Sequence, residues 1–188
     1  MLKELLLYIA AMSIKPQNIR PTVKDVELAL RILLADQLMD KLNWPASAIK
    51  RLFPDVPGNI LKEGMSIQEL SFRQKKVLSE AETLKVSMDK GGRLMILLNR
   101  FLKLGESDRD AYYVGAFAQL IDDYVDVLKD RAEGFHTVFT DYNWDYDKLV
   151  KFTQEVIVPN LSQKWRQFVM EFLLRYKNLL KMLQTLPI

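Results

Sequence analysis

The sequence predicts an all-α protein, on three observations. Glycine and proline, which interrupt helices and strands alike, occur only 7 times each in 188 residues. Apolar residues recur mostly at spacings of three and four, which is the repeat of a helix with one buried face. No segment shows the sustained alternation of apolar and polar residues that is typical of a strand. At 49% hydrophobic residues, the chain suits one globular domain spanning residues 1–188.

Composition also narrows the class of protein. Cysteine is absent, which excludes disulfides, thiolate metal sites and a cysteine nucleophile. The chain carries 27 Lys and Arg against 24 Asp and Glu, a balance too even to indicate a nucleic-acid partner. No apolar stretch reaches the ~18 residues of a membrane-spanning helix, and the first residues lack the pattern of a signal peptide. We therefore expect a cytoplasmic protein, and transient contact with a membrane is compatible with this expectation.

The first half of the chain is expected to hold three helical segments. Residues 1–16 are predicted to form a short packed helix that ends at a proline. A long helix over 22–42 follows, with Thr22 as its cap. Residues 43–59 contain three prolines and a glycine and are predicted to be a structured connection with one short helix. A second long helix is expected over 66–88.

Glycines and short polar residues mark the next boundaries. Gly91 and Gly92 are predicted to break the second long helix, with a shorter apolar helix continuing to about residue 104. Ser107 or Asp108 should cap the helix that follows. That helix is expected to end near Gly134, since glycine commonly terminates helices.

The last third of the chain begins with a predicted loop over 134–144. Two further helices are expected between residues 145 and 186. Pro159 should break or kink the chain between them, because proline cannot donate the helical hydrogen bond.

The helix beginning near Ser107 carries an unusual row of acids. Each helical residue advances by about 100°, so Asp122, Asp126 and Asp130 form one row along the axis. Gln119 and Asp123 flank that row. The remaining surface is apolar far beyond the need of a one-sided helix, which indicates a central helix. Gly115 precedes the row on the same acidic stripe and is predicted to leave room in front of it.

Such a row calls for positive charge. Carboxylates at helical spacing repel one another by about a few tenths of a kcal/mol per pair, and by more when buried. Mg²⁺ prefers oxygen ligands and binds through carboxylates together with phosphate and water. The alternative is a solvated face on which Lys129 and Arg131 pair with the acids. Asp36 and Asp40 form a second acidic pair near the end of the 22–42 helix, so two acidic helices could face each other across bound metal.

The acidic segment resembles a known family. Residues 119–126, Gln-Leu-Ile-Asp-Asp-Tyr-Val-Asp, resemble the second aspartate-rich motif of trans-prenyl diphosphate synthases. Asp126 followed by Asp130 and Gly134 also matches the spacing in squalene and phytoene synthases. Both groups belong to the class I isoprenoid synthase superfamily, whose members are all-α bundles. The resemblance implies that fold.

Two other segments extend the resemblance. Residues 36–40, Asp-Gln-Leu-Met-Asp, resemble the first motif with Gln37 in place of its second acid. Lys90, in the sequence Lys-Gly-Gly-Arg, resembles the lysine that precedes the second motif and contacts diphosphate. The resemblance covers residues 90–134 and, less closely, 23–41. Fewer helices precede the first motif than in the family, so we expect a shortened divergent bundle, a fragment, or a chain whose cavity is completed by a partner in a homodimer or a heteromeric complex.

The resemblance also implies a chemistry and a set of site residues. The implied activity is the Mg²⁺-dependent ionisation of an allylic prenyl diphosphate, followed by condensation or cyclisation. Asp36, Asp40, Asp122 and Asp126 would be the catalytic acids. The implied metal ligands are these four together with Asp123 and Asp130. The residues implied to bind the metal–diphosphate group are Lys90, Arg93, Gln119 and Arg131.

Three functions remain open at this point. The first is the isoprenoid synthase-like enzyme, a prenyltransferase or terpene synthase, which the two acidic motifs favour. The second is a non-catalytic helical subunit that binds prenyl diphosphate or a partner synthase, which Gln37 favours. The third is a helical interaction module whose acids are simply solvated.

Overall fold

The structure, a computed structural model, describes residues 51, 58–102 and 104–185. Every regular element in this part of the chain is helical, which confirms the all-α prediction there. The helices expected over 1–16 and 22–42 lie outside the described residues, as does most of the 43–59 connection. None of the described helices is long and apolar enough to cross a membrane.

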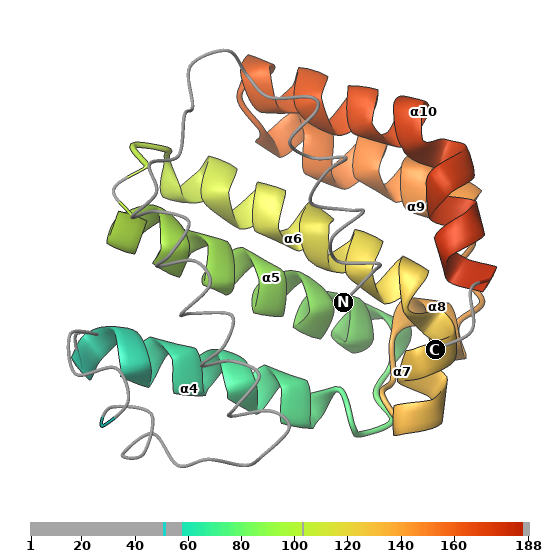
Figure 1. Ribbon diagram of the computed structural model, residues 1–188, viewed down its shortest axis with the longest axis horizontal. Coiled ribbons are helices and arrows are strands. Elements are labelled where there is room, and N and C mark those ends of the chain that lie inside the picture. Colours follow the sequence, from blue (N-terminus) through green and yellow to red (C-terminus); the bar gives the residue numbers. More distant parts are fainter. Residues whose placement is uncertain (1–50, 52–57, 103, 186–188) are drawn as a thin grey trace.

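Three long helices lie side by side in chain order. They are α4 (Gly58–Arg73), α5 (Glu80–Leu102) and α6 (Asp108–Val125). Figure 1 shows α4 at one edge of this row and α6 at the other, with α9 and α10 on the far side of α6. Because α6 is packed from both sides, it is the central helix, as its apolar surface predicts.

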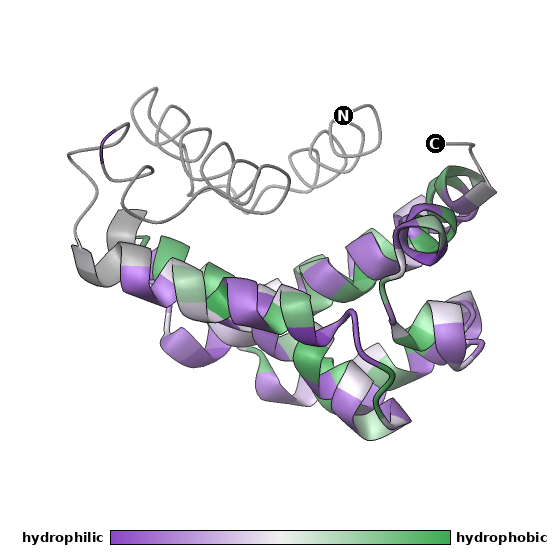
Figure 2. Ribbon diagram, turned by 90° about the horizontal axis from the view of Figure 1, so that it is seen from below, coloured by the Kyte–Doolittle hydropathy of each residue, from purple (hydrophilic) through white to green (hydrophobic). Residues whose placement is uncertain are grey.

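Shorter elements complete the described part. In chain order they are α7 (Val127–Glu133), α8 (Val138–Asp141), α9 (Tyr146–Phe152), a π-helical turn η1 (Thr153–Ile157), a 3₁₀ turn η2 (Val158–Asn160) and α10 (Gln163–Thr185). Hydrophilic and hydrophobic residues alternate along the helices in Figure 2, as expected of amphipathic helices around a shared core. That core includes Leu120, Leu149 and Leu180, each with no exposed surface.

The expected helix over 66–88 is wrong, because two helices meet within that range. The first, α4, ends at Arg73, and α5 begins at Glu80. Ser79 and Glu82 form the start of α5: the Ser79 backbone N–H and hydroxyl both donate to Glu82 Oε2, at 3.1 and 2.6 Å. This Ser-x-x-Glu pattern is the capping box that marks a helix start.

The predicted break at Gly91 and Gly92 is also wrong, since α5 runs through both without interruption. A Cβ atom at position 91 would lie 2.2 Å from the carbonyl oxygen of Gly115 on α6. A Cβ atom at position 92 would lie 2.4 Å from Cδ2 of Tyr112. The glycines therefore allow α5 and α6 to touch through their backbones. The Gly91 backbone occupies the space beside Gly115, so the prediction that Gly115 leaves room in front of the acids is wrong.

The predicted ends of the acidic segment are confirmed. The Ser107 side chain caps α6 by accepting a hydrogen bond from the Asp110 backbone N–H at 3.0 Å. Gly134, with φ of 73°, ends α7 in the left-handed conformation. The segment is not one regular helix, however, because α6 ends at Val125 and α7 begins at Val127, with Asp126 between them.

The last third follows the prediction with one addition. The predicted loop contains the short helix α8, which begins with a capping box between Thr137 and Thr140. The expected break near Pro159 is present as η1 and η2, which separate α9 from α10. The π-helical turn buries Thr153 completely and leaves its hydroxyl without a hydrogen-bond partner among the described residues.

Candidate functional site

The four acids lie along the end of α6 and the start of α7. Asp122 is exposed and Asp130 is half-buried, whereas Asp123 and Asp126 retain only 3% and 7% of their surface. The helix bends at Asp126, yet the backbone hydrogen bonds from Asp126 to Asp122 and from Asp130 to Asp126 persist at 2.9 and 2.8 Å. The row predicted from helical spacing is therefore retained through the bend.

Gln119 lies one turn before the acids and bonds two of them. Its side-chain amide donates to Asp123 Oδ1 at 2.8 Å and, more weakly, to Asp122 Oδ2 at 3.4 Å. An amide that donates to two carboxylates fixes their relative position without neutralising either charge. Gln119 thus lies beside the acids, and its implied role in binding a metal–diphosphate group stays a prediction.

Two lysines supply positive charge. Lys129 Nζ lies 2.9 Å from Asp126 Oδ2. Lys90, half-buried on α5, attracts Asp122 and Asp123 electrostatically, and its ammonium donates to Gln74 Oε1 at 3.5 Å. These two charges face four carboxylates, so the described part of the site keeps an excess of negative charge.

This excess shows in the pKa values of the acids. Burial and repulsion from Asp123, Asp122 and Asp126 raise the pKa of Asp130 to about 8. Surrounding protein atoms and repulsion from Asp123 and Asp126 raise the pKa of Asp122 to about 6. Because Asp122 is exposed, solvent screens part of this shift. A bound cation would remove the repulsion among the carboxylates and so lower these pKa values.

Asp123 has a buried side-chain oxygen that the described residues leave without a partner. Its Oδ2 atom is fully buried and has no hydrogen-bond partner among the described residues. Burial raises the pKa of Asp123, while the Ser87 hydroxyl, the Lys90 ammonium and the Gln119 amide lower it. A buried carboxylate oxygen without a partner is costly, so such an atom is expected to meet a cation or water.

The donor set suits a hard divalent cation. Carboxylate oxygens are the ligands that Mg²⁺ prefers, and Asp122, Asp123 and Asp126 supply them on adjacent turns. Within the described residues, no group of three or more acidic or histidine side chains closes around a single position. Ions held here would therefore complete their shells with oxygens from phosphate or water.

Two buried residues of the site were not predicted from the sequence. Gln74, 3% exposed at the corner after α4, donates through Nε2 to Ser87 Oγ at 3.2 Å. Ser87 has no exposed surface, and its hydroxyl acts on Asp123. The only available signal was that Ser87 lies three residues before Lys90, near enough on α5 to share its face.

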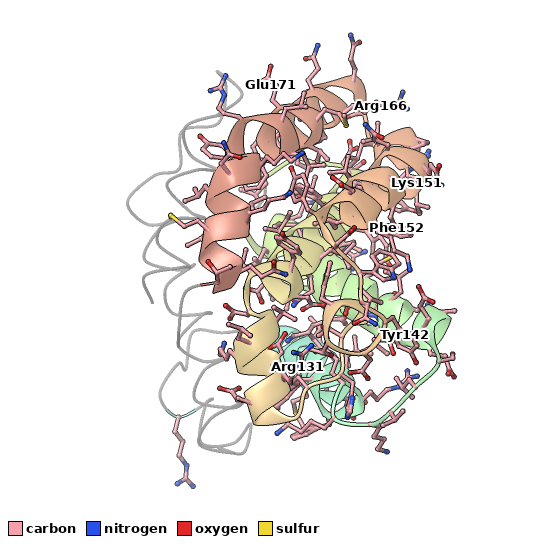
Figure 3. All side chains as sticks on the ribbon, turned by 90° about the vertical axis from the view of Figure 1, so that its right-hand side faces the viewer. Arg131, Tyr142, Lys151, Phe152, Arg166 and Glu171 are labelled. Atoms are coloured by element: carbon pink, nitrogen blue, oxygen red, sulfur yellow. The ribbon has the colours of Figure 1, made fainter. Side chains whose placement is uncertain are left out.

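The two candidate arginines lie apart from the acids. Arg93 is exposed and acts electrostatically on Asp89 and Tyr112. Arg131 extends from α7 toward α8, where its guanidinium donates to the Thr140 carbonyl at 3.4 Å; Figure 3 labels it on α7. Neither arginine is brought to the row of acids within the described part of the chain. Asp36 and Asp40 lie outside the described residues.

Comparisons with protein-family models, with curated proteins and with solved structures found no match.

Proposed function

We propose that the protein is an Mg²⁺-dependent isoprenoid synthase-like enzyme that acts on an allylic prenyl diphosphate. The observation that carries this proposal is the buried Oδ2 of Asp123, which has no hydrogen-bond partner among the described residues and lies within a row of four acids. A row held by salt bridges alone would satisfy its buried oxygens. Here one buried carboxylate oxygen has no such partner in the part of the chain that the structure describes, which favours a cation as its ligand.

The proposal assigns distinct roles to the acids. Asp122 is exposed and is the acid best placed to meet ions that arrive with a substrate. Asp123 and Asp126 are buried and would bind the same ions from the side of the protein interior. Bound Mg²⁺ supplies electrostatic stabilisation of the charge that develops on a leaving diphosphate.

Lys90 supports the choice of a diphosphate as ligand. Its ammonium lies on α5, across the helix crossing from Asp122 and Asp123, where it attracts both. A site that places a lysine beside acids can bind both parts of a metal–phosphate group. The lysine attracts the phosphate, and the carboxylates attract the metal. The sequence resemblance at residues 90–134 points to the same ligand.

A non-catalytic subunit that binds the same ligand is the second candidate. It is favoured by Gln37, which replaces an acid in the segment that resembles the first motif. One fewer carboxylate would weaken binding of the ions needed for ionisation without removing the acids of α6.

The experiment that tests the proposal is thermal melting with and without Mg²⁺ and farnesyl diphosphate. The same samples are assayed for released diphosphate. Asp122→Ala is compared with Asp147→Ala, a matched control on α9 whose side chain is 80% exposed. We expect a rise in Tm that needs both additions, persists in Asp147→Ala and is lost in Asp122→Ala.

The outcomes separate the three functions. Released diphosphate together with the specific Tm rise supports the enzyme. The same rise without release supports the binding subunit. An unchanged Tm in the wild-type protein would leave only the helical interaction module, whose acids are solvated.

A further inference from the structure

We propose that Gln74 and Ser87 are positioning residues that orient Asp123 toward a bound cation. This inference rests on the proposed function, because it concerns the same acids. It assigns a role to two buried polar residues that lie 13 positions apart on either side of the α4–α5 corner.

The hydrogen-bond donors of this group form a chain in one direction. Lys90 Nζ donates to Gln74 Oε1 at 3.5 Å, and Gln74 Nε2 donates to Ser87 Oγ at 3.2 Å. Since Ser87 Oγ already accepts, its own hydrogen is available for the Asp123 carboxylate nearby. The direction of these donors leads from Lys90 toward Asp123, whose pKa the Ser87 hydroxyl lowers.

A second donor holds Asp123 from its own helix. The Gln119 amide donates to Oδ1 at 2.8 Å, whereas Oδ2 has no hydrogen-bond partner within residues 58–102 and 104–185. Ser87 and Gln119 approach from different helices, so the carboxylate is held between α5 and α6. A carboxylate fixed in this way presents one oxygen in a constant direction, as outer-shell partners of metal ligands commonly require.

Gln74 also fixes the corner that carries this group. Its backbone carbonyl accepts from the His136 backbone N–H at 2.7 Å, and its backbone N–H donates to the Leu70 carbonyl at 3.0 Å. The Gln74 side chain therefore extends from a main chain tied to both α4 and the segment before α8. This rigidity makes Gln74 suitable for orienting Ser87 and Lys90 together.

The test compares two deletions of a buried hydroxyl from α5. Ser87→Ala removes the last donor of the chain. Thr83→Val is the matched control, because Thr83 is 1% exposed and its hydroxyl has no hydrogen-bond partner among the described residues. Gln74→Leu, on the other side of the corner, is the second test variant in case Ser87→Ala does not fold.

Two quantities are measured for each variant. The Tm without metal reports structural damage. The Mg²⁺ concentration at half of the Tm rise, with a fixed concentration of inorganic diphosphate, reports positioning. We expect Ser87→Ala and Gln74→Leu to need about tenfold more Mg²⁺, and Thr83→Val to match the wild-type protein.

Each result decides the inference. If Ser87→Ala and Gln74→Leu lower the metal-free Tm but keep the wild-type Mg²⁺ midpoint, the positioning role is overturned and the proposed function stands. If the wild-type protein itself shows no rise with Mg²⁺ and diphosphate, the proposed function is overturned and the positioning role with it.

Discussion

Gly91 and Gly115 touch through their backbones where α5 crosses α6. A Cβ atom at position 91 would lie 2.2 Å from the Gly115 carbonyl oxygen, and one at position 115 would lie 2.2 Å from the Gly91 carbonyl oxygen. The contact is reciprocal and involves main-chain atoms, which cannot turn aside as a flexible side chain can. It sets the separation between the helix that carries Lys90 and the helix that carries the acids.

Gly91→Ala should therefore destabilise the protein despite the better helix propensity of alanine. Overpacking in a core costs about 1–3 kcal/mol, and a clash between two backbones belongs at or above the upper end. Denaturation in urea should show this loss in the free energy of unfolding. The control is Gly64→Ala on α4, where a Cβ would meet no atom within 4 Å. That variant should gain up to about 1 kcal/mol, and an equal gain in Gly91→Ala would contradict the close crossing.

The raised pKa values of the acids predict how the metal-free protein responds to pH. The pKa of Asp130 is raised to about 8 and that of Asp122 to about 6, above the ordinary value of 3.8 in the unfolded chain. Between pH 3.8 and about 8, the folded state thus binds more protons than the unfolded state. Its stability should fall as pH rises from about 4 to 8.

Asp130→Asn tests this pH dependence. In the presence of a chelator, the free energy of unfolding of this variant should increasingly exceed that of the wild-type protein as pH rises from 5 to 8. Urea denaturation at several pH values measures the difference. Asp147→Asn, at an exposed position on α9, should follow the wild-type curve. A constant difference for Asp130→Asn across this range would show that the Asp130 pKa is not raised.

The parts of the fold that were predictable from sequence depend on local chemistry. Ser107 caps a helix because its oxygen accepts from a backbone N–H three residues away, and Gly134 ends one because it adopts positive φ without strain. Pro159 breaks the chain for equally local reasons. The Ser79 and Glu82 capping box is an equally local pattern, and it predicts a new helix at the start of α5.

The features that sequence could not predict depend on contacts between elements. A glycine pair reads as a helix break unless the partner helix is known, and Gly91 meets Gly115 from 24 positions away in the chain. Gln74 and Ser87 are buried polar residues whose relation to Asp123 exists only after α4, α5 and α6 have packed. The acidic row itself was predictable because it follows from helical spacing alone.

The turn between α5 and α6 offers a further test of stability. Asn99 is 6% exposed and bonds Glu106 twice through its amide: Nδ2 donates to the Glu106 carbonyl at 2.8 Å, and Oδ1 accepts from its backbone N–H at 3.1 Å. Asn99→Ala leaves both backbone groups without these partners and should cost about 1–3 kcal/mol in the free energy of unfolding. Asn178→Ala, an exposed position on α10, should change stability by less than about 0.5 kcal/mol. Similar small effects at both positions would show that water replaces the Asn99 amide.

Lys129 allows a test of whether Asp126 binds metal. Its ammonium lies 2.9 Å from Asp126 Oδ2, where it would repel a cation bound to the same carboxylate. Removing one charge at about 4 Å is worth about 1 kcal/mol in water, so Lys129→Met should bind Mg²⁺ with diphosphate about fivefold more tightly. Its metal-free Tm should fall, since the acids lose a counter-charge.

The matched control for Lys129→Met is Lys85→Met. Lys85 Nζ lies 3.0 Å from Asp89, in a similar lysine–aspartate pair outside the row of acids. Its loss should leave the Mg²⁺ midpoint unchanged. If Lys129→Met weakens Mg²⁺ binding, the Lys129 charge attracts the diphosphate more than it repels the metal, which contradicts the expected gain in affinity. If the two variants share the wild-type midpoint, the ions bind away from Asp126, because a charge so close to a metal ligand cannot be removed without effect.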